Sequence, residues 1–174
     1  METKILVAYG SKHGMTAEIA GKIGDTLRKS GLQADVMPVK KVKGVAAYGA
    51  FVLGSSVYIA MWRKEMVKFL QENEKLLSER PVWLFSSGPL GEGDPVELLQ
   101  GWRFPEAQRP LIERISPRGI AVFHGAIDLN KMSIFEKWVL KRVKAQTGDF
   151  RDWEAIGKWA TAIAGEFRSP GQPG

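Results

Sequence analysis

The chain of 174 residues has no cysteine and only two histidines, His13 and His124. Disulfides, thiolate catalysis and cysteine-based metal sites are therefore excluded, and a multi-histidine metal site is not expected. No apolar run approaches the roughly 20 residues of a membrane-spanning helix. An apolar run begins at Ile5, which leaves no room before it for a signal peptide. We expect one cytoplasmic domain over residues 1–168, followed by a disordered tail over 169–174.

Acidic residues are the minority among the charges, since 25 lysines and arginines face 19 aspartates and glutamates, for a net charge of +6. A basic balance of this kind favours an anionic partner, such as an acidic membrane, nucleic acid or an acidic substrate. Nucleic acid has the least support, because no predicted strand interleaves aromatic and basic residues as a single-strand reader would.

Short apolar runs alternate with helical spacing along the chain. The runs read as buried strands, and they are Ile5–Ala8, a looser Gln33–Val39, Ala50–Gly54, Val82–Phe85 and Gly119–Gly125. Amphipathic spacing predicts a helix after the first strand, one long helix over 66–77 and a closing helix over 153–167. This alternation predicts an α/β three-layer sandwich, with a five-stranded parallel sheet of order 2-1-3-4-5 between two helical layers.

A polar loop joins the first strand to the first helix, and it consists of Ser11, Lys12, His13, Gly14, Met15 and Thr16. Backbone N–H groups in such a loop, together with the helix N-terminus, can hold a phosphate. Gly14 permits a positive φ, and Ser11 and Thr16 offer hydroxyl groups. The loop contains neither GxGxxG nor GxxxxGK[ST]. The alternative is an ordinary strand-to-helix turn.

The pattern Ser11-x-His13-Gly14-x-Thr16 is similar to the phosphate loop of the flavodoxin family. This resemblance implies a flavodoxin-like fold and a loop that wraps the 5′-phosphate of FMN. It also implies that FMN is the cofactor. The net charge of +6 departs from the resemblance, because electron-carrier flavodoxins are typically acidic.

Two further loops should meet this one, because the carboxyl ends of parallel strands share one edge of the sheet. Tyr58 and Trp62 offer flat surfaces for the isoalloxazine ring. Backbone amides of the loop after the fourth strand can tune the ring's redox properties. The cofactor residues predicted in these loops are Ser55, Ser56, Val57, Tyr58, Trp62, Ser86, Ser87, Gly88, Pro89, Leu90 and Gly91.

Each of these assignments has an alternative. Tyr58 can simply cap its strand, and Trp62 can be the first core contact of the next helix. The glycine-rich loop over 86–95 can be a floppy connector. For His124 we favour a buried, hydrogen-bonded role over one in proton transfer to the flavin.

Residues 128–148 form an insert between the last strand and the last helix. Within it, 131–144 mixes apolar Ile134, Phe135 and Trp138 with several lysines and one arginine. A basic, aromatic-bearing helix of this type can lie on an anionic membrane surface. The alternative is an ordinary extra helix with a solvated basic face.

Three features together resemble the branch of menaquinone-dependent protoporphyrinogen dehydrogenases. They are Gly54-Ser55-Ser56-x-Tyr58, the insert and the run Asp149-x-x-Asp152-Trp153-Glu154. The resemblance implies an FMN-dependent oxidoreductase that passes electrons from a reduced organic donor to a quinone at a membrane. The resemblance further implies protoporphyrinogen IX as the donor, in haem biosynthesis. The glycine-rich loop over 86–95 differs from that branch.

No residue is assigned to porphyrinogen recognition, and no catalytic side chain is assigned. Two other functions stay open. One is a non-catalytic FMN electron carrier with a protein partner, and the other is a flavin-free basic α/β binding module. A homodimer is also open.

Overall fold

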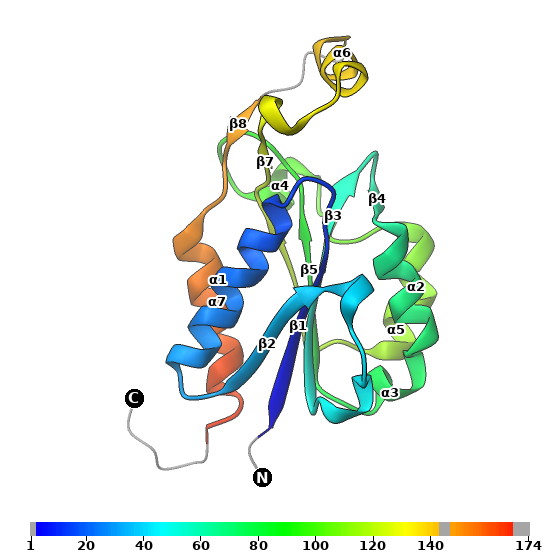
Figure 1. The fold of residues 1–174 in the computed structure, drawn as a ribbon, viewed down its shortest axis with the longest axis vertical. Helices are drawn as coiled ribbons and strands as arrows, with labels where there is room; N and C mark the ends of the chain where they lie inside the picture. Colours follow the sequence, from blue (N-terminus) through cyan, green and yellow to red (C-terminus); the bar gives the residue numbers. More distant parts are fainter. Residues whose placement is uncertain (1–2, 143–146, 169–174) are drawn as a thin grey trace.

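A computed structural model describes residues 3–142 and 147–168. Five parallel strands lie in the order β2-β1-β3-β5-β6 (Figure 1). This is the predicted order 2-1-3-4-5 when these five strands are counted along the chain. Their bounds are β1 Lys4–Gly10, β2 Gln33–Pro38, β3 Ala50–Tyr58, β5 Val82–Ser87 and β6 Gly119–Phe123. The α/β fold class is therefore confirmed. The tail over 169–174 and residues 143–146 of the insert lie outside the described residues.

Helices cover both faces of the sheet (Figure 1). One face carries α1 (Met15–Lys29) and α7 (Trp153–Gly165), and the other carries α2 (Lys64–Glu72), α3 (Glu74–Ser78) and α5 (Arg109–Ile115). Successive strand residues point to opposite faces. On β1, Ile5 and Val7 belong to the hydrophobic core between the sheet and helices α1 and α7. Leu6 belongs to the core on the other face, under α2, α3 and α5. A strand buried on both sides must be apolar throughout, which explains the continuous runs in the sequence.

The expected long helix over 66–77 is in fact two helices, so that prediction was wrong. The chain breaks at Asn73, which has φ −116° and lies between α2 and α3. The Asn73 side-chain amide donates to the Phe69 carbonyl at 2.8 Å. Asparagine side chains compete in this way with the regular helical hydrogen bonds.

Strand β3 continues past the predicted end at Gly54 as far as Tyr58, and then turns back as β4 (Met61–Trp62). Ile59 and Ala60 form the turn, with φ of 49° and 55°. Two positive φ values suit the twist of a two-residue hairpin, but a β-branched residue adopts such a φ only under strain. The sequence carries no glycine or asparagine here, and the hairpin was not predicted.

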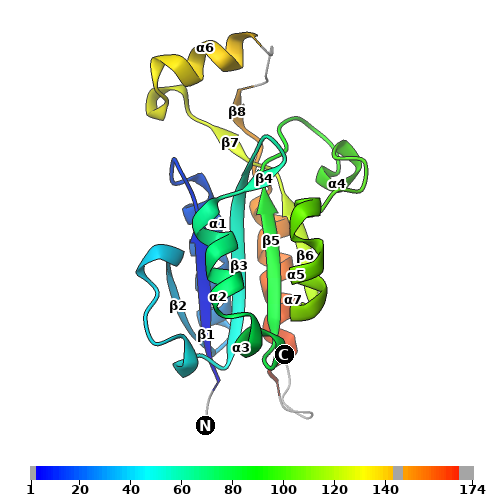
Figure 2. The same cartoon turned by 90° about the vertical axis from the view of Figure 1, so that its right-hand side faces the viewer.

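Beyond β6, the insert stands on a two-stranded antiparallel ribbon of β7 (Ala126–Ile127) and β8 (Gly148–Asp149). The ribbon carries α6 (Ile134–Arg142) past the carboxyl edge of the sheet (Figures 1 and 2). No residue of α6 is buried. None of the helices in residues 3–142 and 147–168 combines the length and apolar character that a membrane crossing requires.

Candidate functional site

The structure brings the ends of β1, β3 and β5 together at one edge of the sheet. Gly10 pairs with Ser55, and Ser56 pairs with Ser87, so the three strands end side by side. The β1–α1 loop, the β3–β4 hairpin and the loop after β5 therefore border the same region. This arrangement places the predicted site where parallel α/β sheets bind their ligands.

The β1–α1 loop fits a phosphate. Gly14 adopts the left-handed conformation, with φ 85°, at the start of α1, and its N–H donates to Ser11 Oγ at 3.0 Å. In the described residues no side chain caps this helix start. A Cβ at Gly14 would meet no atom within 4 Å, so the backbone is open to an approaching group. Uncapped N–H groups at a helix N-terminus are well suited to an anion.

The β3–β4 hairpin presents one aromatic surface. Tyr58 is 60% exposed, whereas Trp62 is only 4% exposed. The indole Nε1 of Trp62 donates to Ser86 Oγ at 2.8 Å inside the core. The expected stacking surface at Trp62 is therefore absent, and the alternative of a core contact describes this residue. Tyr58 remains available for a ring.

Two of the predicted serines use their hydroxyl groups within the protein. Ser55 Oγ accepts from the Arg63 N–H at 2.9 Å and donates to the Ser56 carbonyl at 2.9 Å. Ser86 Oγ donates to the Arg103 carbonyl at 2.8 Å while accepting from Trp62. Both side chains are fully buried. They fix the positions of the loops, and they leave only backbone groups for a ligand.

The glycine-rich loop after β5 is anchored to the neighbouring strand end. The Gly88 N–H donates to the Phe123 carbonyl at 3.2 Å, and the Gly125 N–H donates to the Pro89 carbonyl at 3.0 Å. A Cβ at Gly125 would lie 3.2 Å from Gly88 Cα, so the two backbones pack closely. The loop is thus held in place and is not a floppy connector. Regular structure resumes only at α4 (Pro95–Leu98).

His124 provides two more of these anchors. Its Nδ1 lies 3.1 Å from the Pro89 carbonyl oxygen, and its Nε2 lies 2.7 Å from that of Gly93. The residue is 7% exposed. This geometry supports the favoured structural role, in which the imidazole ties β6 to the glycine-rich loop.

The insert also reaches the β1–α1 loop, which the sequence did not suggest. Glu136 Oε1 on α6 forms an ion pair with Lys12 Nζ and lies 3.4 Å from His13 Nε2. Partial burial lowers the pKa of His13, and the positive charges of Lys12, Arg63 and Lys131 lower it further. Lys12 and Glu136 are 124 positions apart, a separation at which local patterns carry no signal.

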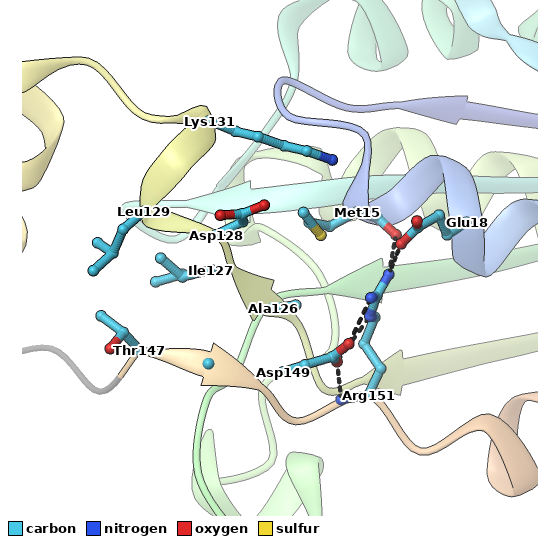
Figure 3. A pocket seen from close by; sticks show the side chains of 11 residues that line it. Met15, Glu18, Ala126, Ile127, Asp128, Leu129, Lys131, Thr147, Asp149 and Arg151 are labelled. Atoms are coloured by element: carbon cyan, nitrogen blue, oxygen red, sulfur yellow. Dashed lines mark hydrogen bonds and ion pairs between the residues drawn. The ribbon is translucent and has the colours of Figure 1, made fainter.

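A cavity of about 490 Å³ lies beside this loop, under the β7–β8 ribbon (Figure 3). Arg151 borders it with a side chain that is only 8% exposed. The guanidinium pairs with Asp149 at 2.6 Å, donates to the Met15 carbonyl at 3.3 Å and pairs with Glu18. Arg151 therefore fastens the foot of the insert to the first turn of α1. The cavity does not extend to Tyr58 or to the glycine-rich loop.

The sheet order and the phosphate-type loop at its switch point define the flavodoxin-like class of α/β proteins. The flavodoxin-domain family matches residues 6–154, and the chain belongs to this family.

One curated relative is the protoporphyrinogen IX dehydrogenase [quinone] of Escherichia coli strain K12, with 22% identity over 92% of this chain and 94% of that protein. Among solved structures, an archaeal flavodoxin aligns with a TM-score of 0.64 and 15% identity, covering 96% of this chain and all of that one. Megasphaera elsdenii flavodoxin aligns with a TM-score of 0.56 and 17% identity, covering 91% and 98%. These structural similarities concern the fold.

Proposed function

We propose that this chain binds FMN and acts as an oxidoreductase, taking electrons from a reduced organic donor and passing them to a quinone or a similar acceptor. The observation that carries the proposal is the β1–α1 loop, where α1 starts without a side-chain cap and Gly14 leaves the backbone open. When bound, the flavin would supply the redox chemistry.

The protein's own part is to bind and orient. The N–H groups at the start of α1, with the hydroxyls of Ser11 and Thr16, would hold the phosphate. The exposed ring of Tyr58 would cover one face of the isoalloxazine. Backbone groups of residues 87–91 would line its edge. Because His124 and Gly125 anchor that loop, its amides would keep a fixed orientation toward the ring.

Three substitutions test the phosphate assignment. We expect Gly14→Val combined with Thr16→Ala to release FMN, because valine resists a φ of 85° and the threonine hydroxyl is lost. Gly31→Val is the matched control, since Gly31 has φ 88° at the other end of α1 and equal free space. FMN retained by the double variant, measured by absorbance after gel filtration, would refute the assignment.

The similarity to the E. coli enzyme supports a finer proposal, the oxidation of protoporphyrinogen IX with a quinone as acceptor. The test is anaerobic mixing of the loaded protein with protoporphyrinogen IX, followed by addition of menaquinone. We expect the flavin absorbance to bleach and then to recover. Bleaching with simpler reductants only would rule out the porphyrinogen and leave the FMN proposal in place.

The exposed face of α6 supports a membrane partner. Ile134, Phe135 and Trp138 are 88%, 70% and 54% exposed, and Lys137 and Lys141 are on the same helix. Such a helix suits the surface of an anionic bilayer. We expect Lys137→Glu with Lys141→Glu to abolish sedimentation with anionic vesicles. Lys43→Glu with Lys75→Glu, equal in charge but outside the insert, should leave sedimentation intact. An equal loss of sedimentation in both double variants would contradict the proposed membrane face, because net charge alone would then explain the binding.

A further inference from the structure

Two lysines lie around the β1–α1 loop, in addition to the hydroxyl and backbone N–H groups proposed to hold the phosphate. Lys12 belongs to the loop, and Lys131 ends the 3-10 turn Leu129–Lys131 of the insert. Figure 3 shows the Lys131 side chain extending from this turn toward the loop. The charge of Lys131 also acts on His13, as the lowered pKa of that residue indicates. The insert thus brings a cation to the phosphate loop.

Lys131 has no carboxylate partner of its own among the described residues, as judged by the ion pairs found there. The nearby Asp128 carboxylate caps its own turn by accepting from the Asn130 N–H at 2.9 Å. Arg63, the third cation near His13, is already paired with Glu65 at 3.2 Å. Lys131 is therefore the cation that an incoming anion can use directly, and Lys12 becomes available when its pair with Glu136 opens.

One anion already occupies this region, the carboxylate of Glu136. Its side chain is only 14% exposed, and it pairs with Lys12 and lies near His13. Glu136 Oε2 also accepts from the Ser133 N–H at 2.9 Å, while Ser133 Oγ accepts from the Glu136 N–H at 3.2 Å. This reciprocal pair is a capping box, and it fixes the carboxylate at the start of α6. The anion is thus held in place by the helix that the insert carries.

Resting on the proposed binding of FMN, we propose that the insert completes the phosphate site: Lys131 contributes a cation to the flavin phosphate, and the phosphate replaces Glu136 as the partner of Lys12. Two anions cannot share one ammonium group without repulsion, so phosphate binding frees α6 from the loop. Occupation of the flavin site is thereby coupled to the position of the exposed face of α6.

The test compares FMN with riboflavin, which has the same ring system without the phosphate. Glu136→Gln removes the competing charge but keeps the capping box, since glutamine serves equally at that position. We expect the Kd for FMN to fall about threefold, the size typical of a partly exposed ion pair. Lys131→Gln should raise that Kd by about threefold. The Kd for riboflavin should not change in either variant.

Matched controls are Glu154→Gln, whose carboxylate pairs with Lys158 on α7, and Lys75→Gln on α3, outside the insert. Neither should change the ratio of the two dissociation constants. A second readout is hydrogen exchange of α6, which should accelerate when FMN binds but not when riboflavin binds.

Equal effects of Glu136→Gln and Lys131→Gln on both ligands, or an unchanged ratio, would overturn the inference while leaving FMN binding intact. Failure of the unmodified protein to bind either ligand would overturn the proposed function as well.

Discussion

Phe85 and Phe135 are the same residue type in opposite surroundings. Phe85, on β5, is fully buried, with the rings of Phe123 and Trp159 at 6.0 and 6.2 Å. Phe135, on α6, is 70% exposed, and within residues 3–142 and 147–168 its ring stacks only on Trp138 of its own helix. The sheet is stabilised by apolar burial, whereas the insert is attached through charged groups.

The space beside Gly54 shows how closely the strands of the sheet pack. A Cβ at Gly54 would lie 2.0 Å from the ring of Phe85, so β3 and β5 tolerate no larger residue there. The insert has the opposite character, because ion pairs of Glu136 with Lys12 and of Arg151 with Glu18 link it and its foot to the body. Salt screens exposed ion pairs, and titration of either partner breaks them. Buried apolar contacts carry no charge to screen or to titrate. The insert can therefore respond to an ionic ligand while the sheet stays unchanged.

The largest expected difference between the two regions comes from removing these phenyl rings. Phe85→Ala should lower the free energy of unfolding by about 3–5 kcal/mol, because it leaves a cavity in the core. Phe135→Ala should change it by less than about 0.5 kcal/mol, because the ring is solvated. Urea denaturation of both variants measures the contrast. A comparable loss in Phe135→Ala would mean that α6 packs against the body.

A smaller effect is expected at the foot of the insert. Arg151→Gln removes a nearly buried guanidinium from Asp149, Glu18 and the Met15 carbonyl. We expect the β7–β8 ribbon to lose about 1–2 kcal/mol of protection in hydrogen exchange. Arg118→Gln is the control, because its pair with Glu166 at 2.8 Å is exposed on both sides. Similar protection in wild type and Arg151→Gln would show that the ribbon is stable without this residue.

The smallest effect is a dependence on pH. A hydrogen bond from Arg151 lowers the pKa of Asp149 below its ordinary value of 3.8. The folded protein thus favours the ionised form, and the stabilisation is present above the ordinary pKa and is lost as the pH falls through the folded-state value. Because Asp149 is half exposed, the loss should not exceed about 1 kcal/mol.

Amide exchange at Ile127 and Gly148, which pair across the ribbon, can follow this change between pH 5 and 3. The Asp149→Asn variant should show no such dependence beyond the intrinsic exchange rate. A wild-type profile as flat as that of the variant would show that Asp149 does not hold the ribbon.

The sheet was predictable because its signals are local. Runs such as Ile5–Ala8 and Val82–Phe85 are apolar on both faces, and their order follows from the way alternating strands and helices pack. The candidate phosphate loop was predicted in the same way, from Ser11, Gly14 and Thr16 within six residues, and its role stays a prediction.

The missed features depend on contacts between distant residues or on unusual local geometry. The β3–β4 hairpin turns at Ile59 and Ala60, which are poor turn formers, so no sequence signal marks it. The contact of Glu136 with Lys12 joins the insert to the first loop across most of the chain. Trp62 was ambiguous because an aromatic residue at a strand end suits a ligand and a core equally well.

The most direct test of the central claim is the visible absorption spectrum of the purified protein, with the released cofactor identified by mass. We predict a yellow protein that releases FMN in a ratio near one per chain. A colourless protein that takes up no added FMN would contradict the flavin site, and would leave a basic α/β binding module as the function to pursue.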